Sequence, residues 1–174
     1  EAYKACYISQ MQNGLLTQLV RIKLGDHIEE AHMRNRALIA HWALAHSPGR
    51  GQDGKDVMEL VQRDGKTYVR INDYEALRTL FGELLAEIQR IKSTGDFEAA
   101  RKLVETYGVH IEYDIHKEIL ERYETLNIAP YKGFINPVYT AVKDAEGNIT
   151  DVNVSYTEGY AEQMLRYSRD YSLE

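Results

Sequence analysis

The chain has 174 residues, of which 44% are hydrophobic and 28% charged, with 12 Gly and 3 Pro. At roughly 100 to 200 residues per domain this length forms one domain or two small lobes, and the composition excludes collagen-like, low-complexity and disordered classes. The 21 Lys and Arg against 27 Asp and Glu give a net charge of −6. This balance disfavours nucleic acids and anionic membranes as partners, because both attract a concentrated positive surface.

Cysteine content and hydropathy limit the compartment. The single cysteine, Cys6, excludes an internal disulfide framework and a CxxC site, and it is predicted to be a small core residue of a helix. A reducing, cytoplasmic compartment is the default expectation. The apolar run at residues 37–45, interrupted by His41, is shorter than the roughly 20 residues of a bilayer span, so no membrane anchor is expected.

The two ends of the sequence suggest a piece of a longer protein. There is no initial Met, and the first residues have the pattern of a helix interior without a capping residue before them. Residues 173–174, Leu-Glu, resemble the vector-encoded dipeptide that precedes a purification tag and are left out of the predictions.

Two helices are predicted first. Residues 3–24 carry apolar side chains three or four apart, and Gly25 follows where a C-terminal glycine is typical. A second helix is predicted from Asp26, as its N-cap, to His46, before a Ser-Pro-Gly sequence ends it.

A loop and a hairpin are predicted next. Residues 49–55, GRGQDGK, have the spacing of a phosphate-binding loop, but Asp56 stands where Ser or Thr would be needed and a helix precedes them. A surface loop is therefore the interpretation. Residues 57–61 and 67–71 are short β-favouring runs joined through Asp64-Gly65, a pair typical of tight hairpin turns.

The rest of the sequence alternates between helices and a second hairpin. A long helix is predicted from Asn72 or Asp73 to about residues 93–95, with helices at 97–107 and from Asp114 onward. An irregular connection is predicted at 129–137, a hairpin at 138–142 and 149–156, and a final helix at 158–171. The fold class is mainly α: a helical bundle with one or two small β-hairpins, divided into regions 1–128 and 129–172.

The motifs of metal and nucleophilic catalysis are missing from the sequence. Of the six histidines, His27 and His32 are five residues apart, as are His41 and His46. Five residues on an α-helix leave two side chains about 140° apart, so neither pair can chelate one ion from a regular helix. The string HExxH and the string GxSxG do not occur, and no metal ligand is predicted in this chain.

The start of the second helix carries the candidate site. His32 and Arg36 are four residues apart, so an imidazole and a fixed cation lie on the same helix face, an arrangement suited to an anionic or carbonyl-bearing ligand. The alternative interpretation has Glu30 paired with Arg34, Arg36 solvated and His32 in an ordinary buried hydrogen bond.

Three strings resemble the carboxy-terminal part of the bacterial dipeptidyl peptidase III family of zinc metallopeptidases. They are residues 13–22 (NGLLTQLVRI), 27–36 (HIEEAHMRNR) and 91–101 (IKSTGDFEAAR). The resemblance implies an enzyme that releases dipeptides from the amino terminus of oligopeptides. Its zinc ligands, in HExxGH and EExR motifs, would lie upstream in the parent, and this fragment would be inactive alone.

The resemblance also implies roles for the helix-two residues. The position of His32 faces the family's cleft and assists catalysis, and Arg36 lies beside it as a substrate-binding residue. The expected partners are the remainder of the parent enzyme and an oligopeptide, with zinc as the parent's cofactor. Arg34-Asn35 departs from the Gln-Ala of animal relatives, and residues 131–157 match distant members poorly.

A non-catalytic helical binding or scaffold module is the competing hypothesis. A detached lobe is expected to expose an apolar helix face, with the stripe formed by Tyr3, Tyr7 and Met11 as a candidate, and to self-associate in isolation.

Overall fold

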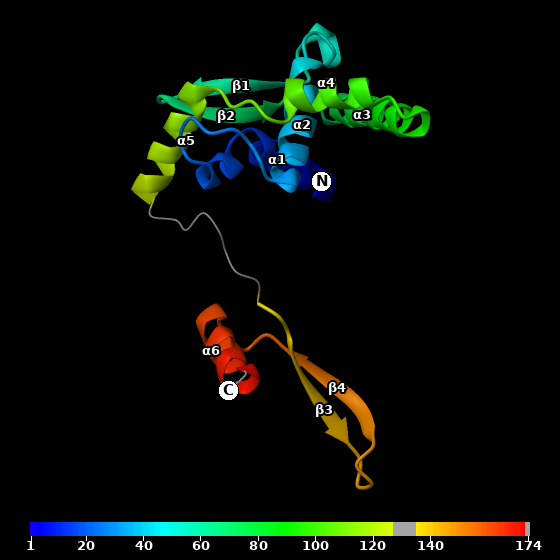
Figure 1. Cartoon of the computed structure of the whole chain (residues 1–174), viewed down its shortest axis with the longest axis vertical. Coiled ribbons are helices and arrows are strands. Elements are labelled where there is room, and N and C mark those ends of the chain that lie inside the picture. Colours follow the sequence, from blue (N-terminus) through cyan, green and yellow to red (C-terminus); the bar gives the residue numbers. More distant parts are fainter. Residues whose placement is uncertain (127–134, 173–174) are drawn as a thin grey trace. The chain divides into compact units, whose positions relative to one another are not determined.

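The computed structural model describes residues 1–126 and 135–172. The chain divides into two compact units, residues 1–130 and 131–174 (Figure 1). The elements of unit 1 are α1 (Ala2–Leu15), η1 (Thr17–Arg21), α2 (Ala31–Ala45), η2 (Gln52–Gly54), β1 (Met58–Arg63), β2 (Lys66–Ile71), α3 (Tyr74–Thr94), α4 (Phe97–Tyr107) and α5 (Tyr113–Leu126). Those of unit 2 are β3 (Val138–Lys143), β4 (Ile149–Ser155) and α6 (Tyr160–Tyr171). The predicted class, mainly α with two small antiparallel hairpins, is confirmed.

Helix α1 ends nine residues earlier than the periodicity predicts. Leu16 leaves the helical region with φ −130° and ψ −68°, and the chain continues as the short 3-10 helix η1. The buried Gln18 side chain donates to the carbonyls of Gly14 (3.0 Å) and Met33 (3.2 Å). The bond to the Met33 carbonyl ties the end of α1 to the start of α2. This long-range contact overrides the local helical pattern. Gly25, at φ +88°, serves a turn rather than a helix end.

Helix α2 also differs from its prediction at one end. It begins at Ala31 with Glu30 as N-cap, not at Asp26, and ends with His46 as C-cap, as predicted. The segment before it is extended at Glu30 (φ −72°, ψ 130°). The buried Ile28 donates its N–H to the carbonyl of Val109 (3.3 Å). Residues 26–30 therefore pack against the segment after α4 instead of forming helix.

The first hairpin agrees with its prediction. Strands β1 and β2 pair antiparallel from Met58 opposite Ile71 to Arg63 opposite Lys66. Asp64 (φ 51°) and Gly65 (φ 70°) form the two-residue turn, whose positive φ values are those of the tightest hairpin turns. The predicted surface loop at 49–55 is confirmed, since its residues are exposed or half-buried and follow a helix.

Ser47 holds the hairpin against the end of α2. Its hydroxyl donates to the carbonyl of Met58 (2.6 Å) and accepts from the Met58 N–H (2.7 Å). The Ser47 side chain is buried, so one hydroxyl satisfies both polar groups of a buried strand residue.

Helices α3 and α4 begin at the predicted caps. The Asp73 carboxylate accepts from the Ala76 N–H (2.9 Å), and that of Asp96 accepts from the Ala99 N–H (3.1 Å). Between them, Gly95 takes the left-handed conformation (φ 66°) that ends many helices.

The core of unit 1 surrounds α2. This helix contacts α1, α3, α4 and β1, and α1 crosses it so closely that a Cβ at Gly14 would collide with the Arg36 carbonyl and the Ala40 methyl. Hydrophobic residues of these elements pack into one cluster. The fully buried set includes Met11, Ala40, Ala43, Val57, Leu77, Leu80 and Ile119.

Helix α5 is fastened to the hairpin by polar contacts. Glu118 accepts from the Thr67 N–H (3.1 Å), and Arg122 donates to the Thr67 carbonyl (2.9 Å) and pairs with Glu118 (2.6 Å). The guanidinium also lies 4.9 Å from the ring centroid of Tyr68. These contacts extend the edge of β2 with side chains instead of a third strand.

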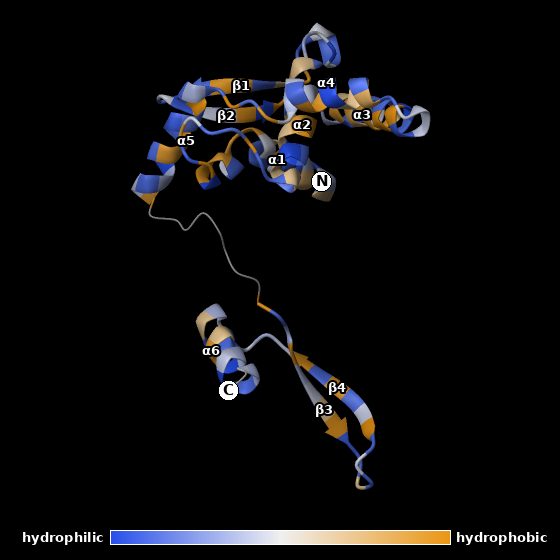
Figure 2. Cartoon of the chain, in the orientation of Figure 1, coloured by the Kyte–Doolittle hydropathy of each residue, from blue (hydrophilic) through white to orange (hydrophobic). Residues whose placement is uncertain are grey.

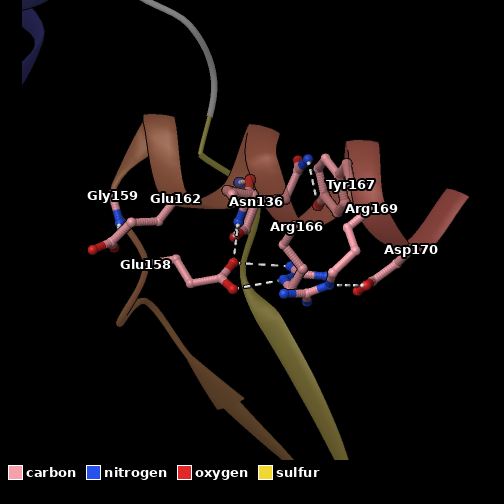
Figure 3. Close-up of polar contacts among 9 residues, drawn as sticks. Asn136, Glu158, Gly159, Glu162, Arg166, Tyr167, Arg169 and Asp170 are labelled. Carbon is pink, nitrogen blue, oxygen red and sulfur yellow. Dashed lines mark hydrogen bonds and ion pairs between the residues drawn. The ribbon is translucent and has the colours of Figure 1, made fainter. Parts of the chain in front are cut away.

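Unit 2 is held together by polar contacts around a buried amide (Figure 3). Gln163 accepts from the Asn136 N–H (2.7 Å) and donates to the Asn136 carbonyl (2.8 Å). Glu158 forms a bidentate pair with Arg166 (2.6 and 2.9 Å). Glu162 accepts from the Gly159 N–H (2.8 Å) at the start of α6. Helix α6 is thus attached to the residues that lead into β3.

The second hairpin agrees with its prediction, and one of its faces is open. Strands β3 and β4 pair antiparallel with Val138 opposite Ser155. Hydrophobic and hydrophilic residues alternate along β4 (Figure 2). The apolar face consists of exposed side chains: Tyr139, Val152, Val154 and Tyr156.

Some predictions lie wholly or mainly outside the described residues. The irregular connection predicted at 129–137 is described only from residue 135, and residues 135–137 belong to no helix or strand. The predicted vector residues 173–174 lie outside the described ranges.

Candidate functional site

The first turn of α2 is fixed by the carboxylate of Glu30. Its two oxygens accept from the N–H groups of His32 (2.9 Å) and Met33 (2.8 Å). These bonds, above all the one from the His32 N–H, lower the pKa of Glu30, and the charges of His32 and Arg36 act in the same direction. A carboxylate at this end of a helix satisfies free N–H groups and interacts favourably with the helix dipole.

Arg34 anchors the same turn from the other side. Its Nε donates to the carbonyl of Ile28 (2.6 Å). The interpretation in which Glu30 pairs with Arg34 is therefore replaced by two separate side-chain-to-backbone contacts. Both hold the extended segment before α2 in place.

His32 and Arg36 stand one turn apart on this anchored helix start. The His32 residue is exposed and Arg36 is half-buried. The expectation of an ordinary buried hydrogen bond for His32 is wrong, because the first turn of α2 reaches beyond the core. The structure thus presents an accessible imidazole, a guanidinium one turn on and a carboxylate at the cap.

This arrangement suits a ligand that carries a carbonyl or carboxylate. An imidazole can donate a hydrogen bond to an oxygen, and a guanidinium can form two parallel bonds with a carboxylate. Both groups are on a regular helix, which holds them at a fixed separation.

The other five histidines have different surroundings. His116 is 1% exposed, and its Nε2 lies 3.2 and 3.0 Å from the carbonyls of Leu19 and Ile22. His46 stacks on Trp42 with ring centroids 3.9 Å apart. Exposed His27 and His110 meet edge to face at 6.2 Å. These four histidines have structural or surface roles.

His41 is the residue that the sequence analysis missed. It is half-buried and lines two adjoining cavities together with His110 and Glu112. The sequence signal was weak, because His110 and Glu112 are about 70 residues away and only the fold brings them to α2.

An apolar groove lies between α1 and α3. It has a volume of about 420 Å³ and is lined by Cys6, Tyr7, Gln10, Ile39, Phe81, Leu84, Leu85 and Ile88. The prediction that Cys6 is a core residue is wrong, since Cys6 is exposed at this groove.

The predicted apolar stripe of α1 is mostly covered. Met11 is fully buried, Tyr7 packs edge to face on Phe81 with centroids 5.1 Å apart, and the Tyr3 hydroxyl donates to Glu75 (2.7 Å). Helix α3 therefore occupies this face, and the open apolar surface is displaced to Leu85 and Ile88.

The described residues contain neither a cluster of metal-ligand side chains nor a membrane-spanning helix. Within 1–126 and 135–172, no three His, Cys, Asp or Glu side chains come together as possible metal ligands. In the same ranges, no helix has both the length and the apolar character of a bilayer span.

No protein-family model matches the chain, and no curated protein matches it.

Proposed function

We propose that this chain is the carboxy-terminal segment of a dipeptidyl peptidase III-like zinc exopeptidase and forms part of its substrate-facing wall. The sequence support is the pair of strings HMRNR at 32–36 and KSTGD at 92–96. The observation that carries the proposal is the placement of His32 and Arg36 on an anchored, accessible helix start.

In this proposal His32 is the catalytic residue of the segment. Its imidazole donates to the oxyanion that develops on the scissile carbonyl, a type of contact worth about 3 kcal/mol in the transition state. Arg36 binds a carboxylate or carbonyl of the oligopeptide substrate. The resemblance implies that the zinc ligands, in the HExxGH and EExR motifs, belong to the remainder of the parent enzyme, and no step here runs through the metal.

The test uses the full-length parent with zinc and a chromogenic Arg-Arg substrate. We expect His32→Ala to lower kcat about a hundredfold and Arg36→Ala to act mainly on KM. The matched control is His27→Ala, which removes an exposed imidazole from the segment before α2. Equal kcat for the His32→Ala variant and the wild type at equal folded concentration would overturn the role of His32.

A non-catalytic helical binding or scaffold module is the second candidate. It is favoured by the open apolar groove between α1 and α3, which suits a helix-in-groove contact. The coding sequence upstream distinguishes the two: the motifs HExxGH and EExR support the exopeptidase, and their absence supports the module.

A further inference from the structure

The two adjoining cavities beside α2 have an apolar interior and a polar entrance. The inner cavity has a volume of about 250 Å³ and is lined by Leu15, Leu19, Leu60, Ile111 and Ile115, besides His41 and Glu112. The outer one, of about 540 Å³, opens past Thr106 and shares His41, His110 and Glu112. Binding pockets for drug-sized ligands hold roughly 300 to 1,000 Å³, so the inner cavity fits a smaller, fragment-sized group.

The ring of His41 has a defined donor and a defined acceptor. Its Nδ1 lies 2.9 Å from the Ala37 carbonyl and 3.2 Å from the Tyr107 carbonyl. Because carbonyl oxygens only accept, Nδ1 carries the proton and donates to both. In the neutral ring Nε2 is then an acceptor. Burial favours that neutral form by lowering the pKa of His41.

The charges around His41 favour a cation. Glu112 lines both cavities, and its negative charge acts on the His41 ring. The other titratable groups of the lining are His110 and the phenol of Tyr107, and α1, η1 and β1 contribute only leucines. Neither cavity has a lysine or arginine in its lining among the described residues.

We infer that these cavities form a binding site for a small primary ammonium ion that carries a branched apolar group. The alkyl group fills the leucine and isoleucine interior. The ammonium donates to Nε2 of His41 and pairs with the carboxylate of Glu112 at the entrance. The site is separate from His32 and Arg36, and it does not depend on the proposed peptidase activity.

The experiment is calorimetric titration of the full 174-residue chain with 3-methylbutylamine. The neutral analogue 3-methylbutanol and the anion 3-methylbutanoate are the matched probes, since they keep the alkyl group and change only the head. We expect the amine to bind about tenfold or more tightly than the alcohol, and the anion to bind most weakly.

Two variants separate the contacts. Glu112→Gln removes the charge, and His41→Asn keeps an amide donor for the two carbonyls but removes Nε2. Each is expected to weaken amine binding by about tenfold. Glu112→Gln is expected to leave alcohol binding unchanged, whereas His41→Asn weakens it too, because an alcohol hydroxyl can also donate to Nε2. The control Glu29→Gln removes an exposed carboxylate outside the cavities and leaves both affinities unchanged.

The dependence on pH supplies an independent readout. Burial holds the pKa of His41 below the ordinary histidine value of about 6.5. Amine affinity therefore falls only at more acidic pH, as the pH drops through that lowered pKa, because protonated His41 has no acceptor and repels the ammonium. The His110→Asn variant keeps this dependence if His41 is responsible. Equal affinity for amine and alcohol, no saturable amine binding, or an unchanged affinity in Glu112→Gln would overturn the assignment.

Discussion

At the scale of single residues, Gly14 shows how one missing side chain sets a helix crossing. The Arg36 carbonyl and the Ala40 methyl occupy the space that a Cβ at residue 14 would need. The same crossing brings α1 against the helix that carries His32 and Arg36. Glycine is therefore required at position 14 because α1 and α2 approach each other closely there, not because the backbone adopts an unusual conformation.

Gly14→Ala is expected to lower the free energy of unfolding by about 1 to 3 kcal/mol, because the backbone of α2 must shift to accept the methyl group. Urea denaturation measures the change. Gly82→Ala is the control within α3, where nothing lies within 4 Å of the added Cβ, and it is expected to stabilise by about 0.5 to 1 kcal/mol. A neutral Gly14→Ala would show that the two helices separate easily.

Glu30 connects the helix start to pH. Its pKa in the folded chain lies below the ordinary value of 4.5. Its stabilising contribution is therefore complete above pH 4.5 and is lost as the pH falls through the lower folded value.

The expected outcome is a difference in unfolding free energy between the wild type and Glu30→Gln that shrinks as the pH falls from about 7 to about 3. Urea midpoints at each pH measure it. Glu29→Gln, at the neighbouring exposed carboxylate, should show a smaller and flatter difference. A difference in unfolding free energy that stays constant across this pH range would contradict the role of the Glu30 charge.

At the scale of elements, the hairpin β1–β2 depends on a contact outside its own strands. A two-stranded hairpin is marginal alone. Here Ser47 supplies a donor and an acceptor to buried Met58, and Glu118 with Arg122 does the same for Thr67. Helices α2 and α5 therefore take the place of neighbouring strands.

Ser47→Ala should cost about 1 to 3 kcal/mol, because both backbone groups of Met58 lose their buried partner. Thermal unfolding followed by circular dichroism is a suitable measurement. Ser93→Ala, which removes an exposed hydroxyl bonded to the Arg90 carbonyl in α3, is expected to change stability little. Equal effects of the two substitutions would show that the hydrogen bonds between Ser47 and Met58 do not stabilise the hairpin.

Helix α6 depends on one buried amide in the same way. The Gln163 side-chain amide forms hydrogen bonds with both the backbone N–H and the backbone carbonyl of Asn136. Gln163→Leu keeps an apolar body but leaves both Asn136 backbone groups without this partner. Amide hydrogen exchange of α6 should then become faster. Ser168→Ala, at an exposed position of α6, should leave the exchange unchanged. Unaltered exchange in Gln163→Leu would show that α6 is attached by other contacts.

At the scale of the whole molecule, each unit leaves an apolar surface open. In unit 1 this surface is the groove with Leu85 and Ile88, and in unit 2 it is the hairpin face with Val154 and Tyr156, of which Tyr156 is 72% exposed. Large exposed apolar patches are typical of contact sites with other chains. Both surfaces are therefore candidate contact sites for another chain, including a second copy of this one.

The isolated chain is accordingly expected to self-associate as its concentration rises, as measured by sedimentation velocity. Leu85→Glu and Val154→Glu are tested separately. Whichever substitution disrupts the surface that mediates self-association should weaken that association. Ala86→Glu and Asn153→Glu are the controls, since they add the same charge at exposed neighbouring positions. A chain that stays monomeric at all concentrations would contradict the expectation.

The sequence by itself determined the elements whose signals lie within a few residues. Asp73 and Asp96 mark helix starts and Asp64-Gly65 marks a turn, because caps and tight turns are local backbone chemistry. It also placed His32 and Arg36 on one helix face, since their spacing is enough for that. The mainly α class followed from the same patterns.

The tertiary structure decided what depends on contacts between distant residues. The end of α1, the start of α2 and the exposure of His32 follow from packing near Gln18, Ile28 and Val109. The gathering of His41 and Glu112 around one cavity is of the same kind. Periodicity cannot predict these features, because the burial of a side chain depends on which other element packs against it.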